Sequence, residues 1–227
     1  MKEVIDRIQS RGYWHRVFRP LPFEEERLEL GKLYAIVQQN AVENGWGCPM
    51  INPGMPSSTT DAYVGHVFEW EDCLEAWRFY TSGQFVSVKA FMLDWREKAT
   101  YARLNLPGGA TDYLGVLDAV RSFTEFHEFA ARLAMTEAGD ERVSVSLKAR
   151  YLKGRTLISE APHRRLLIQR YQTAAEDFSY SREVTRTELV AQPSEMALEG
   201  VRKLFQCFGC PVEIATLRRI SEELKRR

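Results

Sequence analysis

Hydrophobic residues recur with two different periods along residues 69–95, and the change of period predicts two consecutive elements. Three apolar residues first follow the spacing of one helix face: Leu74, Trp77 and Tyr80. Asp72 and Glu75 have the spacing of a capping box, and Gly83 can take the left-handed conformation that ends a helix. Residues 85–93 are then almost continuously apolar, as in a strand that is covered on both faces. We therefore expect a short helix from Asp72 that leads through Gly83 into a central strand.

The same periods predict the elements on either side of this unit. Strands are expected where apolar and polar residues alternate, or where short apolar runs lie between turn signals: 13–19, 63–70, 113–120, 142–152, 155–159 and 177–185. Helices are expected where apolar residues recur every three or four positions: 2–10, 24–42, 122–135 and most of 186–227. Lys153-Gly154 is a turn signal, so the strands on either side of it are expected to pair as a hairpin. Loops are expected at 44–49, 52–61 and 96–112.

These elements do not alternate in the regular strand–helix order of a parallel sheet. The pattern therefore predicts an α+β fold with a mixed or largely antiparallel sheet of about six or seven strands, flanking helices and a helical C-terminal segment. We expect residues 1–185 to form the core domain and residues 186–227 to pack on it. Thr185 and Glu188 have the spacing of a capping box at this boundary.

The composition is that of a chain with a large core and no charge bias. Hydrophobic residues make up 44% of the 227 positions, which is enough to fill a core, so we expect an ordered domain. The formal net charge is zero, which argues against a protein that coats nucleic acid through many phosphate contacts. The sequence shows neither the apolar core of a signal peptide nor a run of apolar residues long enough to span a membrane. We therefore expect a cytoplasmic protein that does not bind membranes.

The pair Cys207-x-x-Cys210 is the pattern that most resembles a chemical site. Such a pair occurs in redox proteins and supplies half of a zinc site. A zinc ion needs four ligands, however, and Cys48 and Cys73 are isolated in the sequence. The four histidines are scattered, and no phosphate-binding loop or nucleophile elbow is present. We therefore expect structural cysteines, and no catalytic residue, metal or cofactor.

Arginine and aromatic residues are interleaved at 13–19 and 77–80. Such mixtures can stack on bases or bind nucleotide-like ligands, and they also occur where aromatic residues fill a core beneath arginines. We favour the core interpretation for the aromatic residues. The residues that we expect to bind a ligand or a partner are Arg16, Arg19, Arg78, Tyr80 and Gln84. Short basic clusters at 163–165 and 225–227 could also contact phosphate.

Three blocks of sequence carry a resemblance to a known family: residues 11–20, 45–51 and 77–85. With the pattern of Leu189, Pro193, Ala197 and Phe205, they resemble an uncharacterised prokaryotic family of sensor-like domains. That family is associated with proteins that carry a Schlafen/AlbA-type domain, assigned to DNA or ATP binding, and with phage-defence loci. The resemblance implies an accessory or partner protein and assigns no catalytic residue. Cys210 stands where it leads us to expect a tryptophan.

Three functions follow from these observations, in order of preference. The first is a non-enzymatic cytosolic accessory or sensor-like protein that binds a partner protein or a ligand, with antiphage defence as its setting. The second is a nucleic-acid-binding module. The third is an enzyme whose site the sequence does not reveal. A concentrated basic patch would favour the second, and a deep polar pocket with perturbed titratable groups would favour the third.

Overall fold

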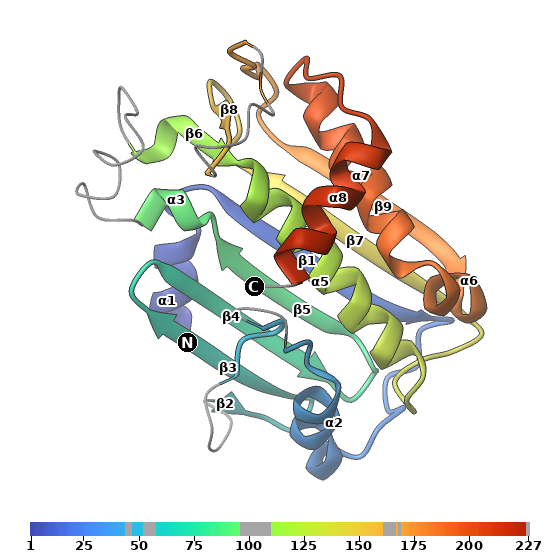
Figure 1. Ribbon diagram of the computed structural model, residues 1–227. Coiled ribbons are helices and arrows are strands. Elements are labelled where there is room, and N and C mark those ends of the chain that lie inside the picture. Colours follow the sequence, from blue (N-terminus) through green and yellow to red (C-terminus); the bar gives the residue numbers. More distant parts are fainter. Residues whose placement is uncertain (44–46, 52–57, 96–109, 161–166, 168, 226–227) are drawn as a thin grey trace.

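A seven-stranded antiparallel sheet forms the centre of the protein (Figure 1). The computed structural model describes residues 1–43, 47–51, 58–95, 110–160, 167 and 169–225. The strands of the sheet lie in the order β2-β3-β4-β5-β1-β7-β9. Their bounds are β1 (Tyr13–Leu21), β2 (Ser58–Thr59), β3 (Tyr63–Trp70), β4 (Cys73–Tyr80), β5 (Phe85–Ala90), β7 (Arg142–Arg150) and β9 (Phe178–Thr185). A separate parallel pair joins β6 (Tyr113–Gly115) to β8 (Thr156–Ile158).

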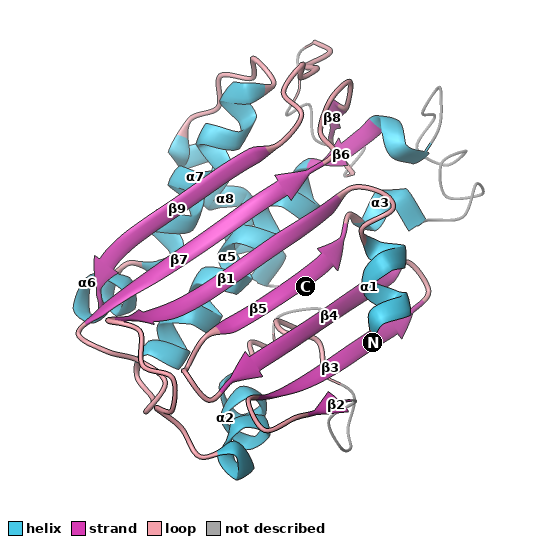
Figure 2. Ribbon diagram, turned by 180° about the vertical axis from the view of Figure 1, so that it is seen from behind, coloured by secondary structure: helices cyan, strands magenta, loops and turns pink. Residues whose placement is uncertain are grey.

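The helices are distributed unequally between the two faces of the sheet. One face carries α2 (Leu33–Asn40), α5 (Val116–Ala134), α6 (Arg186–Ala191), α7 (Pro193–Cys207) and α8 (Ile214–Lys225), and we call it the helix-covered face (Figure 1). On the opposite face α1 (Lys2–Ile8) lies over β4 and β5, while no described helix lies over β1, β7 and β9 (Figure 2). The remaining described helical segments are short: α3 (Met92–Trp95) and the 3₁₀ turns Leu30–Lys32 and Ala110–Asp112.

Strand alternation explains why the two faces differ, because successive side chains of a strand point to opposite sides. Trp14 and Phe18 of β1 point into the main core, where Phe85 of β5 packs edge-on against Phe129 of α5 at 4.8 Å. Helix α5 is buried along most of its length and also contacts α7 and α8. Apolar residues of α7 and α8 belong to the same core cluster as those of the sheet.

We call the other side of the sheet the open face. It carries the odd-numbered residues of β1 and their neighbours in the register: His15, Val17, Arg19, Val86, Val88, Ser144, Ser146 and Lys148. These residues are smaller and more polar than those of the core. An antiparallel sheet can leave such a face in contact with water, because its polar side chains need no cover.

The predicted α+β class with a largely antiparallel sheet is confirmed. The strands expected at 13–19, 63–70, 142–152 and 177–185 correspond to β1, β3, β7 and β9, and the helix at 2–10 corresponds to α1. The capping box of Thr185 and Glu188 is formed at the start of α6. Parts of the loops expected at 44–49, 52–61 and 96–112, the cluster at 163–165 and the last two residues lie outside the described residues.

The helix expected after Asp72 is wrong, because this segment forms β4. Most of β4 is buried on both faces, so the polar alternation of a half-exposed strand is missing and the helical spacing occurs by coincidence. Glu75 does not cap a helix but is fully buried. Gly83 does have a positive φ of 78°, in the turn that joins β4 to β5. The two consecutive elements are therefore two strands of a hairpin.

Three other boundaries also differ from the expected ones. The helix expected at 24–42 is limited to α2, preceded by a 3₁₀ turn. The strand expected at 113–120 stops at Gly115, since α5 begins at Val116. The hairpin expected around Lys153-Gly154 is not formed, because β8 pairs in parallel with β6 rather than with β7.

Trp77 is buried as expected, although it lies on a strand rather than a helix. It is 1% exposed, its indole N–H donates to the Met50 carbonyl at 3.1 Å, and its ring stacks on Tyr34. Trp77→Ala should lower the free energy of unfolding by about 3–5 kcal/mol, the range for large aromatic residues in cores. Trp70→Ala is the matched control, because Trp70 is 59% exposed and should lose less than about 1 kcal/mol. Urea denaturation measures both, and equal losses would contradict this assignment of the core.

Candidate functional site

The sheet register separates the five residues that we expected to bind a ligand or a partner. Arg16 points to the helix-covered face, whereas Arg19 and Arg78 belong to the open face. Tyr80 follows on the same side of β4, and Gln84 lies opposite it at the hairpin turn, where the Tyr80 N–H donates to the Gln84 carbonyl. Four of the five therefore lie on one side of the sheet, and Arg16 does not.

Arg16 is occupied by groups of the protein itself. Its side chain is fully buried and forms an ion pair with the equally buried carboxylate of Glu75. Its Nε donates to the Ser87 hydroxyl at 2.9 Å, another guanidinium nitrogen donates to the Cys48 sulfur at 3.4 Å, and the group lies over the Phe126 ring at 5.5 Å. Because no part of the guanidinium is accessible, we assign Arg16 a structural role and do not keep it in the binding site.

Two more charged side chains lie in the same interior region. Lys89 is 3% exposed, and no hydrogen bond or ion pair joins it to another described residue. Glu125 of α5 is 5% exposed; one of its oxygens is 3.7 Å from Arg121 Nε, and the other has no hydrogen-bond partner. Burial raises the pKa of Glu125 to about 7, although Lys89 and Arg121 act in the opposite direction. A carboxyl group that titrates near neutral pH is suited to acid–base chemistry.

The cavity that the described residues form beside Glu125 is small. It lies between α5 and α8, is lined by Arg121, Glu128, Ser221 and Lys225 among others, and has a volume of about 10 Å³. A volume of this size holds about one water molecule. The described residues therefore give Glu125 a place for water but not for a substrate.

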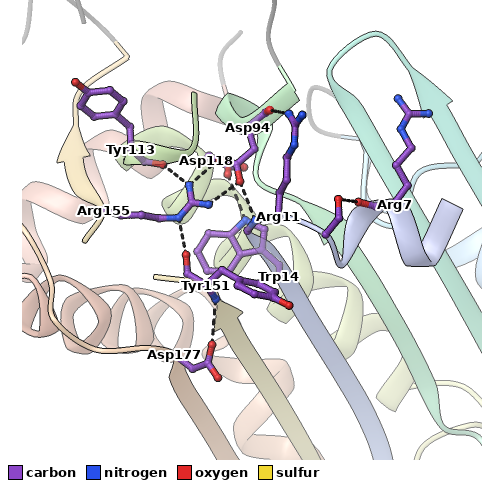
Figure 3. Close-up of polar contacts among 11 residues, drawn as sticks. Arg7, Arg11, Trp14, Asp94, Tyr113, Asp118, Tyr151, Arg155 and Asp177 are labelled. Atoms are coloured by element: carbon purple, nitrogen blue, oxygen red, sulfur yellow. Dashed lines mark hydrogen bonds and ion pairs between the residues drawn. The ribbon is translucent and has the colours of Figure 1, made fainter. Parts of the chain in front are cut away.

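A second buried network lies at the end of the sheet where β1 begins (Figure 3). Arg155 makes a bidentate ion pair with Asp94, with both N–O distances at 2.6 Å, and also donates to the carbonyls of Tyr113 and Tyr151. The Gly12 N–H completes the network by donating to Asp94 at 2.8 Å. Burial raises the pKa of Asp94, while Arg155 opposes this rise.

Each nitrogen of the Arg155 guanidinium donates within this network, so it joins α3, β6 and the turn before β8 to the start of β1. A side chain at position 12 would not fit, because a Cβ there would lie 2.4 Å from an Arg155 nitrogen. We therefore interpret the Asp94–Arg155 pair as structural. Both side chains are buried, and their charges are paired with each other.

The open face contains a groove of about 180 Å³ beside α1. Its floor is aliphatic, formed by Ala76, Val86 and Val88 from β4 and β5, and Ile5 of α1 forms one wall. We call this feature the open-face groove. Polar side chains line its edges: Gln9, His15, Arg78 and Tyr80. The groove therefore unites two of the residues expected from the sequence with residues that the sequence did not single out.

One positively charged side chain lines this groove and two others lie near it on the open face. Arg78 borders it directly, Lys148 is the register partner of His15, and Arg19 is exposed two residues beyond Val17. None of the three cations forms an ion pair with another described residue. The pKa of His15 is lowered, first by burial and then by Lys148 and Arg150, so His15 is neutral at pH 7. The groove thus combines an apolar floor with a polar rim that contains Arg78 and has two more cations near it.

The remaining candidates give no site. Cys207 is exposed and Cys210 is buried, both are free thiols, and burial raises the pKa of each, so neither is activated. Among the residues that the structure describes, no three histidine, cysteine or carboxylate side chains are placed to share a metal ion. No described helix is both long enough and apolar enough to span a membrane.

The structural role of Arg16 can be tested by mutation. Arg16→Leu would break the ion pair of buried Glu75 and leave Lys89, its register partner on β5, as the neighbouring cation, which should cost about 3–5 kcal/mol of unfolding free energy. The matched change Arg19→Leu, in the same strand but exposed, should cost less than about 0.5 kcal/mol. Replacing both members of the pair, as Arg16→Leu with Glu75→Leu, should restore part of the loss. If the two single variants melt alike, the pair does not hold the sheet together.

The raised pKa of Glu125 predicts how the stability of the protein depends on pH. Because its pKa is higher in the folded chain than its ordinary value of 4.5, its contribution to stability is present below pH 4.5 and is lost as the pH rises through about 7. Glu125→Gln keeps the shape of the protonated group, so it should raise the unfolding free energy at about pH 8 by roughly 2–3 kcal/mol. At about pH 4 it should change little. Glu128→Gln, on the same helix, is the control; a similar pH profile for both variants would refute the assignment.

Comparison of this chain with protein-family models, with curated proteins and with solved structures finds no match. Its function must therefore be inferred from the geometry described above.

Proposed function

We propose that this protein is a non-enzymatic accessory protein that binds a partner protein through the open face of its sheet. The observation that carries this proposal is the unequal cover of the two faces. Five helices pack on one side, whereas β1, β7 and β9 have no described helix over the other (Figure 2). The open-face groove lies over β4 and β5 beside α1, and it borders this uncovered region at His15 of β1. A concave apolar feature on an otherwise polar surface is a common mark of an interaction site.

The side chains of the open face suit contact with another protein. Val17 and Val86, which are neighbours in the register, are only half-buried. Around them lie short polar side chains, including Ser146 and its partner Ser181 on β9. Short side chains lose little conformational freedom when they are covered, so a partner can pack on this surface at low entropic cost.

The two alternative functions have weaker support. An enzyme is favoured by the pKa of Glu125 near 7, but the described cavity beside it holds only about one water molecule. Nucleic-acid binding is favoured by Arg19, Arg78 and Lys148, but the formal net charge of the chain is zero. The family resemblance adds the further expectation that the partner is encoded in a phage-defence locus.

Site-specific photocrosslinking in the native host tests the proposal. The photoreactive residue p-benzoylphenylalanine is placed at Ser181, which is exposed on the open face, or at Gln206, which is exposed on α7. We expect one discrete protein adduct from position 181 and not from position 206, and we expect Lys148→Glu to reduce it because Lys148 lies beside Ser179 in the register. No adduct at 181, or the same adduct at both positions, would refute the proposal. A nuclease-sensitive adduct would favour the nucleic-acid function.

A further inference from the structure

We infer that the partner presents an acidic, extended segment whose single apolar side chain enters the open-face groove. This inference rests on the proposed function and names the chemical class of the partner. Its evidence comes from three properties of the groove: its size, the balance of charge around it and the chemistry of its walls.

The size of the groove fits one side chain better than a cofactor or a drug-sized ligand. Its volume is about 180 Å³, whereas pockets for small molecules usually measure about 300–1,000 Å³. The floor of Ala76, Val86 and Val88 can contact only an apolar group without loss of hydrogen bonds. A large aliphatic or aromatic side chain, anchored by the chain on either side of it, meets both conditions.

The charged side chain that lines the groove, Arg78, is positive. On and beside β9 the acidic residues are already neutralised, since Glu183 pairs with Arg142 and Asp177 pairs with Arg150. Glu3 and Asp6 of α1 are exposed and form no ion pair with a described residue, but neither lines the groove. Arg19, Arg78 and Lys148 likewise form no ion pair with any described residue. No carboxylate lines the groove. Charge complementarity therefore favours a partner segment with carboxylates on either side of its apolar residue.

Arg78 is held in position before any partner binds. Its guanidinium lies 4.9 Å from the centre of the Tyr63 ring, and its Nε is 3.5 Å from the Met1 sulfur. Its two terminal nitrogens donate to no described residue. A guanidinium that is already oriented, with both terminal nitrogens available, can bind a carboxylate in a bidentate manner.

The walls of the groove argue against single-stranded nucleic acid as the occupant. Proteins that bind single strands without sequence preference stack bases on exposed aromatic rings. Here the floor and one wall are aliphatic, and one side of the Tyr63 ring is covered by Arg78. The rim could contact phosphate, but of the aromatic residues in the lining Tyr80 is half-buried and Trp77 is 1% exposed, so the described lining offers no row of exposed rings on which successive bases would stack.

Fluorescence anisotropy with synthetic probes tests this inference on the full chain. The first probe is a labelled peptide of sequence Asp-Glu-Asp-Phe-Asp-Glu-Asp. The comparison probes are the same peptide with alanine in place of phenylalanine, a Lys/Arg version that keeps the phenylalanine, and a labelled oligothymidylate. We expect the acidic phenylalanine peptide to bind. Its alanine counterpart should bind roughly tenfold more weakly, because a buried aromatic anchor usually dominates such contacts. The basic peptide should not bind.

Two variants locate the binding. Arg78→Glu should weaken binding of the acidic peptide at least about tenfold, since it replaces an attraction by a repulsion, and added salt should weaken the wild-type complex. Arg219→Glu is the matched control, because Arg219 is exposed on α8, on the helix-covered side, and should leave binding unchanged. Circular dichroism of both variants checks that they remain folded.

The outcomes of the peptide-binding and crosslinking experiments distinguish the inference from its alternatives. Equal binding of the acidic and basic peptides, or no effect of Arg78→Glu, would overturn the inference. Tighter binding of the oligothymidylate than of the acidic peptide would replace it with the nucleic-acid function. If crosslinking at Ser181 succeeds while no acidic peptide binds, only the acidic character is wrong and the binding face stands. If both experiments fail, the proposed function fails as well.

Discussion

The ion pair of Arg16 and Glu75 is the contact on which the centre of this sheet depends. It links β1 to β4 across β5, whose Ser87 accepts a hydrogen bond from the same guanidinium. The other oxygen of Glu75 accepts from the Met50 N–H, so the pair also fixes the segment that covers this end of the core. A buried ion pair contributes less through its own attraction than through the penalty for losing one partner. It thus selects one strand register, because a shift of β1 by one residue would turn Arg16 to the open face and leave Glu75 buried without its ion-pair partner.

The buried charged side chains affect how the core around them is packed. Arg16, Lys89 and Glu125 take up space on the helix-covered face that apolar side chains would otherwise fill, and aromatic residues such as Phe126 pack around them. The Asp94–Arg155 pair does the same at the end of the sheet, where it holds the separate β6–β8 pair. Both networks lie inside, so their charges are not accessible to a partner.

The sequence predicted the class of the fold because most strands are half-buried and show a clear period of two. In β7, Val143, Val145 and Leu147 alternate with polar residues, and the strand was located correctly. In β4 the period is lost because both faces are buried, so Leu74, Trp77 and Tyr80 suggested a helix. The spacing of Asp72 and Glu75 supported that error. Two carboxylates three residues apart give the same sequence pattern whether they cap a helix or, as Glu75 does, one of them pairs with a buried arginine.

The open-face groove could not be predicted in the same way. Its residues come from α1, β1, β4 and β5, and only the register of the sheet brings them together. The arginine-rich segments did point to Arg78 and Tyr80, but nothing in the sequence separated these from Arg16. One signal was available: Lys89 stands in a run that the sequence marks as buried, and it indicated a polar interior.

The position of α1 has a consequence for how the groove behaves over time. This helix has only seven residues, too few to be stable alone, so it persists because Ile8 and its neighbours pack on β4 and β5. Ile5 of the same helix forms a wall of the groove. The groove therefore exists only while α1 is docked, so binding in the groove and docking of α1 are thermodynamically coupled. An occupant that contacts Ile5 would slow the detachment of α1, and hydrogen exchange at the first residues of the chain would report whether the groove is filled.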